Sequence, residues 1–225
     1  MPEQFKFQLL VRTIVEIGHQ IKSIHLNQQN EIKEGIVFVE SGIAKIYGIN
    51  EKGIKINTDL IFEGEIFRVQ NGNYLSRDNF YLEGLKYSRL IYIETEQLSS
   101  YEMEFLPEIL MKCFNERLKR IHQQKVRNYD LDLQERIFYL LFDFCLIFGK
   151  QSGSHITMPN YFTHDDLSNM LRTCRQNITS CLNVLKRDGI IKYDRKEIKI
   201  ERSIFEEKKV KYLSQIKKNK VLVPC

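Results

Sequence analysis

The chain has 225 residues, of which 43% are hydrophobic, so it is long enough for two modest domains and too apolar to be disordered. No apolar run reaches the roughly 18 residues of a membrane span, and the N-terminal residues lack the features of a signal peptide, so we expect a cytoplasmic protein. The formal net charge is +5, yet the segment from Thr163 onward holds 15 Lys and Arg against 8 Asp and Glu. This local excess of positive charge indicates a segment that binds a phosphate backbone.

Five cysteines are scattered along the chain without C-x-x-C spacing, at positions 113, 145, 174, 181 and 225. Cys113, Cys145 and Cys181 fall on predicted apolar stripes, where a free cysteine packs as a small hydrophobe. This usage is typical of a reducing compartment and offers no metal-ligand pattern. We therefore expect no metal and no required cofactor.

The N-terminal half is predicted to be mainly β. Residues 8–17 fit either a strand or a short helix. From Glu34 onward, short apolar or alternating runs predict strands at 36–40, 43–48, 54–57, 80–85 and 90–94, with Tyr74 in a further short strand. Such closely spaced strands are the signature of a small antiparallel β-barrel or jelly roll.

Helical patterns follow these strands. Ser99 with Glu102 predicts the start of a helical region, and Pro107 suits the first turn of a long helix that continues to about Tyr129. A near-heptad seam on the long helix predicts a dimer stalk, with packing on its own β domain as the alternative. The predicted seam residues are Leu110, Phe114, Arg117, Leu118 and Ile121.

The remaining chain is predicted to form a second domain. Residues 132–148 are strongly apolar and indicate a core helix, residues 155–157 a short strand, and residues 203–217 a last helix. We expect three parts: a β domain over 1–106, a dimerisation helix over 107–130 and a DNA-binding domain over 131–225.

Residues 163–200 predict two short helices with a tight break, followed by a β-hairpin over 190–193 and 197–200. Thr163 with Asp166 is a capping-box-like start, and Thr173 with Gln176 repeats that signature for the second helix. The second helix has an apolar stripe at 178, 181, 182 and 185. Gly189 stands where a helix end needs a positive φ.

The outward face of the second helix carries short polar or bidentate side chains. They are Arg175, Gln176, Thr179, Ser180 and Asn183, and no acid lies between Cys174 and Lys186. A helix that enters the major groove needs such side chains, because Arg reads guanine and Gln or Asn reads adenine. The alternative is an ordinary solvated face, which is usually rich in Glu and Lys. We therefore interpret this face as one that reads DNA.

Three stretches resemble the Crp/Fnr family of bacterial transcription regulators. The family's strand–hairpin–strand segment is similar to VESGIAKIYGINEKGIKINTDLIFEGE, and the start of its dimer helix is similar to LPEILMKCFNERLKRI. Its helix-turn-helix is similar to THDDLSNMLRTCRQNITSCLNVLKRDGII, the most specific of the three, and the Tyr-Gly-Ile-Asn hairpin is similar to PrfA-like members. The resemblance implies a cyclic-nucleotide-binding-like β domain, a dimerisation helix and a winged helix-turn-helix. It also implies a homodimer that regulates transcription from a pseudo-palindromic DNA site.

Carried over residue by residue, the resemblance implies that Arg175 and Gln176 read bases, with Thr179 and Ser180 on the same face. Ser180 stands where the family often has a second base-reading arginine, so the family's familiar operator is not expected. The predicted phosphate-binding residues are Thr163, Thr173, Cys174, Asn177, Lys186, Arg187, Lys192, Arg195 and Lys196. Arg172 replaces the Gly common in the turn, which costs roughly 1 kcal/mol if the residue is left-handed.

The predicted effector pocket departs from the cyclic-nucleotide members, which have a Gly-Glu-Leu turn and an Arg-Ser-Ala-like phosphate cradle. The candidate pocket residues here are Arg68, Arg77, Gln124 and Lys125. Neither motif is present beside them, so the sequence does not predict cAMP binding. The first cysteine is Cys113, which excludes the N-terminal cysteine cluster of oxygen-sensing members, and isolated histidines do not support haem.

Two other functions stay open: a winged-helix module that binds protein, and a cupin-type metal oxygenase. An oxygenase site needs two or three His with a carboxylate, and the β region has only His19 and His25. The basic C-terminal third and its acid-free face argue against the protein-binding module. We expect a non-enzymatic regulator whose partners are double-stranded DNA, a second copy of the chain and, for an activator, RNA polymerase.

Overall fold

The computed structural model describes residues 3–26, 33–69, 79–99, 101, 104–127 and 129–210, which form two compact units. The first unit contains residues 1–129 and 161–172, and the second contains residues 130–160 and 173–225. Among the described residues, no helix has the length and apolar character needed to cross a membrane.

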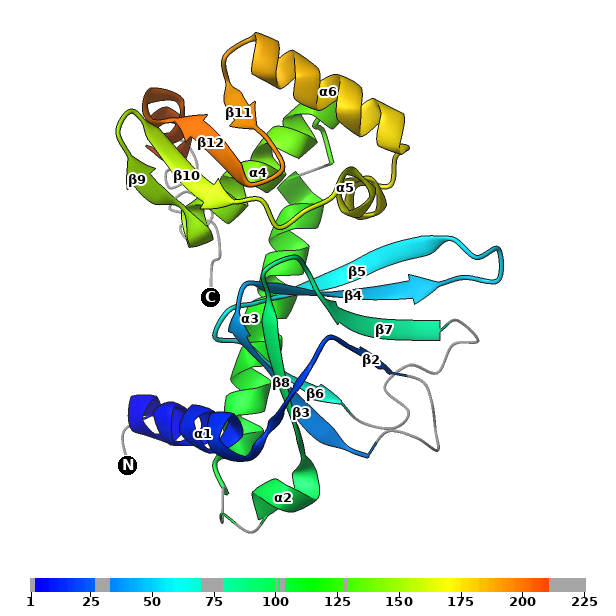
Figure 1. Cartoon of the computed structure of the whole chain (residues 1–225), viewed down its shortest axis with the longest axis vertical. Coiled ribbons are helices and arrows are strands. Elements are labelled where there is room, and N and C mark those ends of the chain that lie inside the picture. The colour runs from blue at the N-terminus through cyan, green and yellow to red at the C-terminus, as the bar shows by residue number, and fades with distance from the viewer. Residues whose placement is uncertain are drawn as a thin grey trace, which may run out of the picture. The chain divides into compact units, whose positions relative to one another are not determined.

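The strands of the first unit form two four-stranded antiparallel sheets, ordered β1-β8-β3-β6 and β2-β7-β4-β5 (Figure 1). The strands are β1 His19–Ile21, β2 Ser23–His25, β3 Gly35–Ser41, β4 Ile43–Ile49, β5 Lys55–Phe62, β6 Ile66–Val69, β7 Asn79–Gly84 and β8 Arg89–Glu94. Two separate sheets confirm the predicted jelly roll in preference to a closed barrel. Tyr74 lies outside the described residues.

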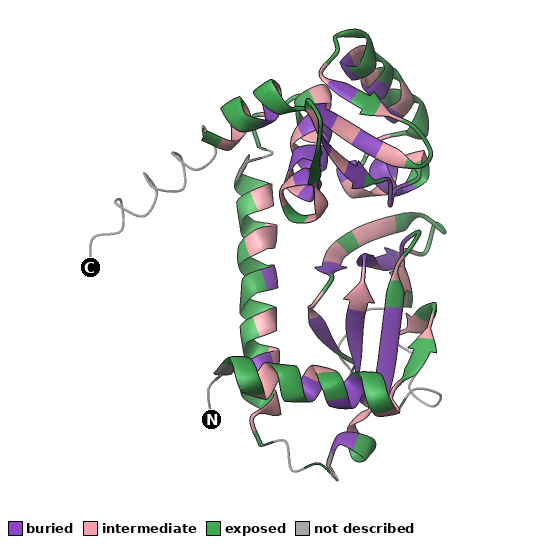
Figure 2. Cartoon of the chain, turned by 60° about the vertical axis from the view of Figure 1, so that its left-hand side comes forward, coloured by how far each residue is buried: buried purple, intermediate pink, exposed green. Residues whose placement is uncertain are grey.

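Strand β3 is buried on both faces, which explains its unbroken apolar run. Val37 and Val39 lie in the cluster between the two sheets, whereas Ile36 and Phe38 lie in a second cluster with helices α1 and α3. Alternation of side chains along a strand produces this division, and Figure 2 shows the central strands as largely buried. The helices of this unit are α1 Glu3–Ile17, α2 Thr95–Ser99, α3 Leu106–Arg127 and α5 His164–Leu171.

Helix α1 settles the ambiguity of residues 8–17. Residues four apart share a face in a helix and in a strand, so the local pattern fitted both. Leu10 and Ile14 are fully buried in the cluster under α1, while Arg12 and Glu16 form an ion pair of 2.7 Å on its outer side. Packing on the sheet therefore selects the helix.

One of the two helix starts predicted after β8 is wrong. Ser99 ends α2, so the expected helix start at Ser99 was wrong, and Glu102 lies outside the described residues. Pro107 lies in the first turn of α3, as predicted, where its missing N–H costs no helical hydrogen bond.

Two arginines hold α3 against the β domain. Arg120 donates to the Glu65 carboxylate at 2.6 and 3.1 Å and to the Leu60 carbonyl at 2.8 Å. Arg117 is only 7% exposed, and its Nε lies 3.2 Å from Asp59 Oδ2 in an ion pair whose N–H is not aligned for a hydrogen bond. Such charge-assisted contacts fix which side of α3 faces the sheets.

The predicted dimer seam is therefore wrong at Arg117, whereas Leu110 is half-buried and its place in the seam stays a prediction. Arg117 pairs with Asp59, and Leu110 packs on the cluster beneath α1. A heptad pattern alone does not distinguish the side that a helix turns to its own domain from the side that it leaves open. We call outer seam the exposed residues Met111, Phe114 and Leu118 together with the half-buried Ile121.

The second unit has a small sheet ordered β11-β12-β10-β9. Its elements are α4 Leu133–Phe148, β9 Lys150–Ser152, β10 His155–Pro159, α6 Arg175–Arg187, β11 Ile191–Tyr193 and β12 Glu197–Glu201, and residues 202–210 are helical. The strand expected at 155–157 is confirmed as β10, and its partner β9 was not predicted. The part of the expected last helix beyond residue 210 lies outside the described residues.

Helix α4 forms the core of the second unit, as its apolar sequence predicted. Asp132 accepts the Glu135 N–H at 2.8 Å, and the Glu135 carboxylate accepts the Asp132 N–H at 3.2 Å, which forms a capping box. Cys145 is buried on this helix, and burial raises the pKa of its thiol to about 12. The thiol therefore stays protonated and packs as a hydrophobe.

Replacement of Arg117 by Met should lower the free energy of unfolding by about 3 kcal/mol at neutral pH, because it leaves Asp59 buried without its partner. Burial raises the pKa of Asp59, with Arg117 opposing that rise. A raised folded-state pKa means that stability is lost as pH rises through it, so the deficit of Arg117→Met should shrink as acid protonates Asp59.

Urea denaturation at several pH values measures this deficit. Lys119→Met, which breaks only the exposed pair with Glu116, is the control and should change stability by less than about 0.5 kcal/mol. Addition of Asp59→Asn to Arg117→Met should recover most of the loss. A deficit that does not depend on pH would contradict the role of Asp59.

Candidate nucleic-acid interface

Helix α5 begins with the predicted capping box. Thr163 Oγ1 accepts the Asp166 N–H at 3.0 Å, and Asp166 Oδ2 accepts the Thr163 N–H at 3.0 Å and its hydroxyl at 2.7 Å. Burial opposes ionisation of Asp166, but hydrogen bonds from Lys45 and Thr163 outweigh it and lower the pKa of the carboxyl. The donors of Thr163 are thus engaged within the chain, and its phosphate contact stays a prediction.

No local sequence pattern indicated the contacts that Asp166 makes with strands of the same unit. Lys45 Nζ on β4 lies 2.6 Å from Asp166 Oδ1, and the two side chains are 14% and 11% exposed. Asn57 on β5 donates to the Asp166 carbonyl at 3.4 Å. Lys45 also lies 3.6 Å from the Glu83 carboxylate.

The break after α5 depends on Arg172, which has φ 53° and ψ 54°. This left-handed conformation is the one expected for a position where Gly is common. The next helix begins one residue later than predicted, because Cys174 and not Thr173 is its N-cap residue, and no side chain caps it. Thr173 belongs to the turn instead, where its hydroxyl accepts the Asn177 amide at 3.1 Å.

Helix α6 presents polar residues outward because its apolar stripe is buried against α4. Ile178, Leu182 and Leu185 are at most 2% exposed. Thr179 is half-buried and its hydroxyl donates to the Arg175 carbonyl at 3.0 Å, so it is less accessible than predicted for a base-reading residue. The exposed polar residues on the first two turns and beyond are Arg175, Gln176, Asn177, Ser180 and Asn183.

The end of α6 confirms the predicted role of Gly189, which has φ 70°. Its N–H donates to the Lys186 carbonyl at 3.1 Å, and the Ile190 N–H donates to the Leu185 carbonyl at 3.0 Å. These two bonds form a Schellman motif. Lys186 and Arg187 lie exposed in the last turn of α6.

The β11–β12 hairpin, which we call the wing, carries exposed cations around one turn. Asp194 Oδ1 accepts the N–H groups of Lys196 at 2.7 Å and Glu197 at 2.9 Å. These backbone hydrogen bonds lower the pKa of Asp194, so the turn is held by an ionised carboxylate. Lys192, Arg195 and Lys196 are exposed on the wing.

The predicted effector residues are spread over different elements. Arg68 is exposed on β6 with its Nη2 3.6 Å from Glu34 Oε2, Gln124 is half-buried and Lys125 is exposed on α3, and Arg77 lies outside the described residues. Within the described part of the chain, no group of three or more His, Cys, Asp or Glu side chains is arranged to hold a metal ion.

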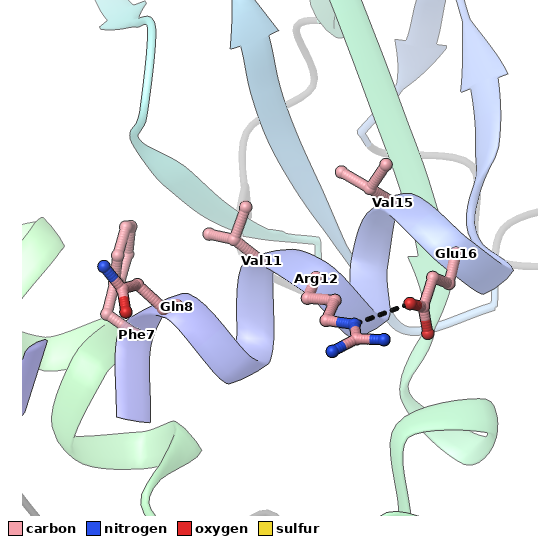
Figure 3. A pocket seen from close by; sticks show the side chains of 6 residues that line it. All are labelled: Phe7, Gln8, Val11, Arg12, Val15 and Glu16. Atoms are coloured by element: carbon pink, nitrogen blue, oxygen red, sulfur yellow. Dashed lines mark hydrogen bonds and ion pairs between the residues drawn. The ribbon is translucent and has the colours of Figure 1, made fainter. Parts of the chain in front are cut away.

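A mostly apolar hollow of about 400 Å³ lies elsewhere, along α1 (Figure 3). Phe7, Val11 and Val15 line it, and the Arg12–Glu16 ion pair lies beside them. None of the predicted effector residues contributes to this hollow, so the effector pocket stays a prediction.

Comparison with known proteins supports the helix-turn-helix. Residues 135–202 match the family described as the Crp-like helix-turn-helix domain, which spans α4 to β12. No curated protein sequence matches the chain.

Several solved transcription regulators share the fold at low sequence identity. A CooA mutant from Carboxydothermus hydrogenoformans is 15% identical with a TM-score of 0.61, over 88% of this chain and 89% of that one. FixK2 from Bradyrhizobium japonicum is 12% identical with a TM-score of 0.63, over 85% and 96%. A CRP-family transcriptional regulator from Thermus thermophilus is 13% identical with a TM-score of 0.63, over 84% and 95%. The chain thus has the fold of Crp/Fnr transcription regulators and a Crp-like helix-turn-helix domain, whereas the PrfA-like resemblance stays a prediction.

Replacement of Arg172 by Gly should raise the free energy of unfolding by about 0.5–1 kcal/mol, because Gly adopts a positive φ without the Cβ clash. Thermal or urea unfolding measures the gain. Lys119→Gly, at an exposed position in the interior of α3, is the control for ordinary helical conformation and should lose about 1 kcal/mol. A loss of stability in both variants would show that the turn is not strained.

Proposed function

We propose that the protein is a sequence-specific, DNA-binding transcription regulator that acts as a homodimer on a pseudo-palindromic site. The observation that carries the proposal is the outward face of α6 within a Crp-like helix-turn-helix domain. The first two turns of this face carry the exposed polar residues Arg175, Gln176 and Ser180 and no acid. Side chains of this kind can enter the major groove without repulsion from phosphates.

In this proposal Arg175 and Gln176 read base edges from the first turn of α6, and Ser180 lies one turn further along. Arg175 is the main specificity residue, because a bidentate arginine–guanine pair is worth about 1–3 kcal/mol of discrimination. Thr179 contributes less, since its hydroxyl proton is engaged by the Arg175 carbonyl.

Phosphate binding is assigned to exposed cations at the end of α6 and on the wing. Cations there would position the helix and release counterions without reading sequence. These residues are Lys186, Arg187, Lys192, Arg195 and Lys196, each exposed in the structure.

Dimerisation is assigned to the outer seam of α3. Met111 is 59% exposed, Phe114 50% and Leu118 37%. An apolar seam on a long helix is stabilised when a second copy covers it. Two copies would place their α6 helices in successive major grooves, about 34–36 Å apart. The jelly roll is assigned a sensory role, and contact with RNA polymerase is expected if the protein is an activator.

Arg175→Ala should weaken binding to a preferred duplex by about 10-fold or more and reduce its preference over random DNA, because one base-reading side chain is lost. Lys196→Ala should weaken binding to both duplexes alike and reduce the slope of log affinity against log salt by about 1. Fluorescence anisotropy titration at several salt concentrations measures both quantities. Equal loss on both duplexes in the two variants would contradict the division into base readers and phosphate anchors.

Leu118→Glu should convert the dimer to a monomer, because a second copy would bury the new carboxylate without a partner. Sedimentation velocity measures the assembly state. Gln123→Glu adds the same charge at an exposed position on another side of α3 and should leave the dimer intact. A Leu118→Glu protein that sediments like the unaltered chain would contradict the seam.

A further inference from the structure

The helix-turn-helix motif is divided between the two compact units. Helix α5 belongs to the unit that contains the jelly roll, whereas α6 belongs to the other unit. Only the turn formed by residues 172–174 joins them along the chain. A contact that holds α5 on the jelly roll therefore acts on the helix that directly precedes α6, the proposed base-reading helix.

The contact that holds α5 is built around Asp166. Its carboxylate binds Lys45 of β4 at 2.6 Å, and its carbonyl accepts the Asn57 amide of β5 at 3.4 Å (Figure 1 shows α5 beside β5). The ion pair is largely buried, with 14% and 11% of the two side chains exposed. A buried ion pair is weak evidence for added stability, and its best attested use is to specify one arrangement among several.

Strand β5 also contacts the proposed dimer helix. Asp59, two residues after Asn57, pairs with Arg117 of α3 at 3.2 Å. A β-bulge lies between these contacts, since Asn57 is opposite Tyr47 and Asp59 is opposite Ile46. The β4–β5 hairpin thus contacts α5 through Lys45 and Asn57 and contacts α3 through Asp59.

We propose that the Lys45–Asp166 ion pair is a regulatory contact that couples the β4–β5 hairpin to the helix-turn-helix. A partner or ligand that shifts the hairpin would make or break this pair and so change the freedom of α5. DNA affinity would change with it, because α5 and α6 bind DNA as one motif. This inference rests on the proposed DNA binding and adds a means of control to it.

A double-mutant cycle tests the coupling. Lys45→Met and Asp166→Asn should each change the dissociation constant for an enriched duplex by at least about fivefold in the same direction. The double variant should differ little from Asp166→Asn alone, because the pair is already broken there and any loss at the Thr163 capping box is common to both. Lys33→Met and Glu94→Gln break an exposed pair of 2.9 Å in the same unit and are the controls, with changes below about twofold.

Two affinity results would overturn the inference: unaltered affinity in Lys45→Met, or single-variant effects that add fully in the double variant. Amide hydrogen exchange of residues 167–171 is a second readout that needs no DNA. Lys45→Met should speed exchange there, and the Lys33→Met control should not. The two readouts separate the two proposals. If the unaltered chain bound no DNA but Lys45→Met sped this exchange, the proposed DNA binding would be wrong, whereas stabilisation of α5 by the Lys45–Asp166 pair would be confirmed. Unaltered exchange would overturn the contact as well.

Discussion

Burial of Ile178, Leu182 and Leu185 is the constraint on which the proposed DNA-facing surface depends. Each aliphatic side chain removed from water contributes about 1.5–3 kcal/mol, whereas exposed polar substitutions usually change stability by less than about 0.5 kcal/mol. The apolar stripe therefore sets the rotation of α6 about its axis, and the polar residues take the remaining positions. Their identity is then free to be selected for recognition, because it hardly affects folding.

Helix α3 illustrates the same separation with charges in place of aliphatic side chains. Arg117 and Arg120 turn one side of the helix to Asp59 and Glu65, and Phe114 and Leu118 are left on the open side. A charge-assisted contact between exposed groups adds little stability, but the same contact between largely buried groups specifies one orientation of the helix. The helix thereby joins the β domain on one side and keeps an apolar seam on the other.

Local signals in the sequence were sufficient where the structure depends on neighbours along the chain. The Thr163 capping box, the positive φ of Gly189 and the apolar stripe of α6 were all predicted, because each involves residues within a few positions. The N-cap of α6 was misplaced by one residue, since the left-handed Arg172 moves Thr173 into the turn. Arg117 was misassigned because its partner lies on a distant strand, and the Lys45–Asp166 pair joins residues 121 positions apart.

Selection of bound duplexes from a random pool, with the ligand-free protein at a stated salt concentration, tests the central claim most directly. We expect enrichment of a palindrome whose half-sites are one helical turn apart, because two α6 helices would enter successive major grooves. Failure to bind any duplex at low salt would contradict DNA recognition and favour a protein-binding role for the winged helix. Binding that is sensitive to salt but enriches no sequence would contradict base reading by α6 in the ligand-free protein.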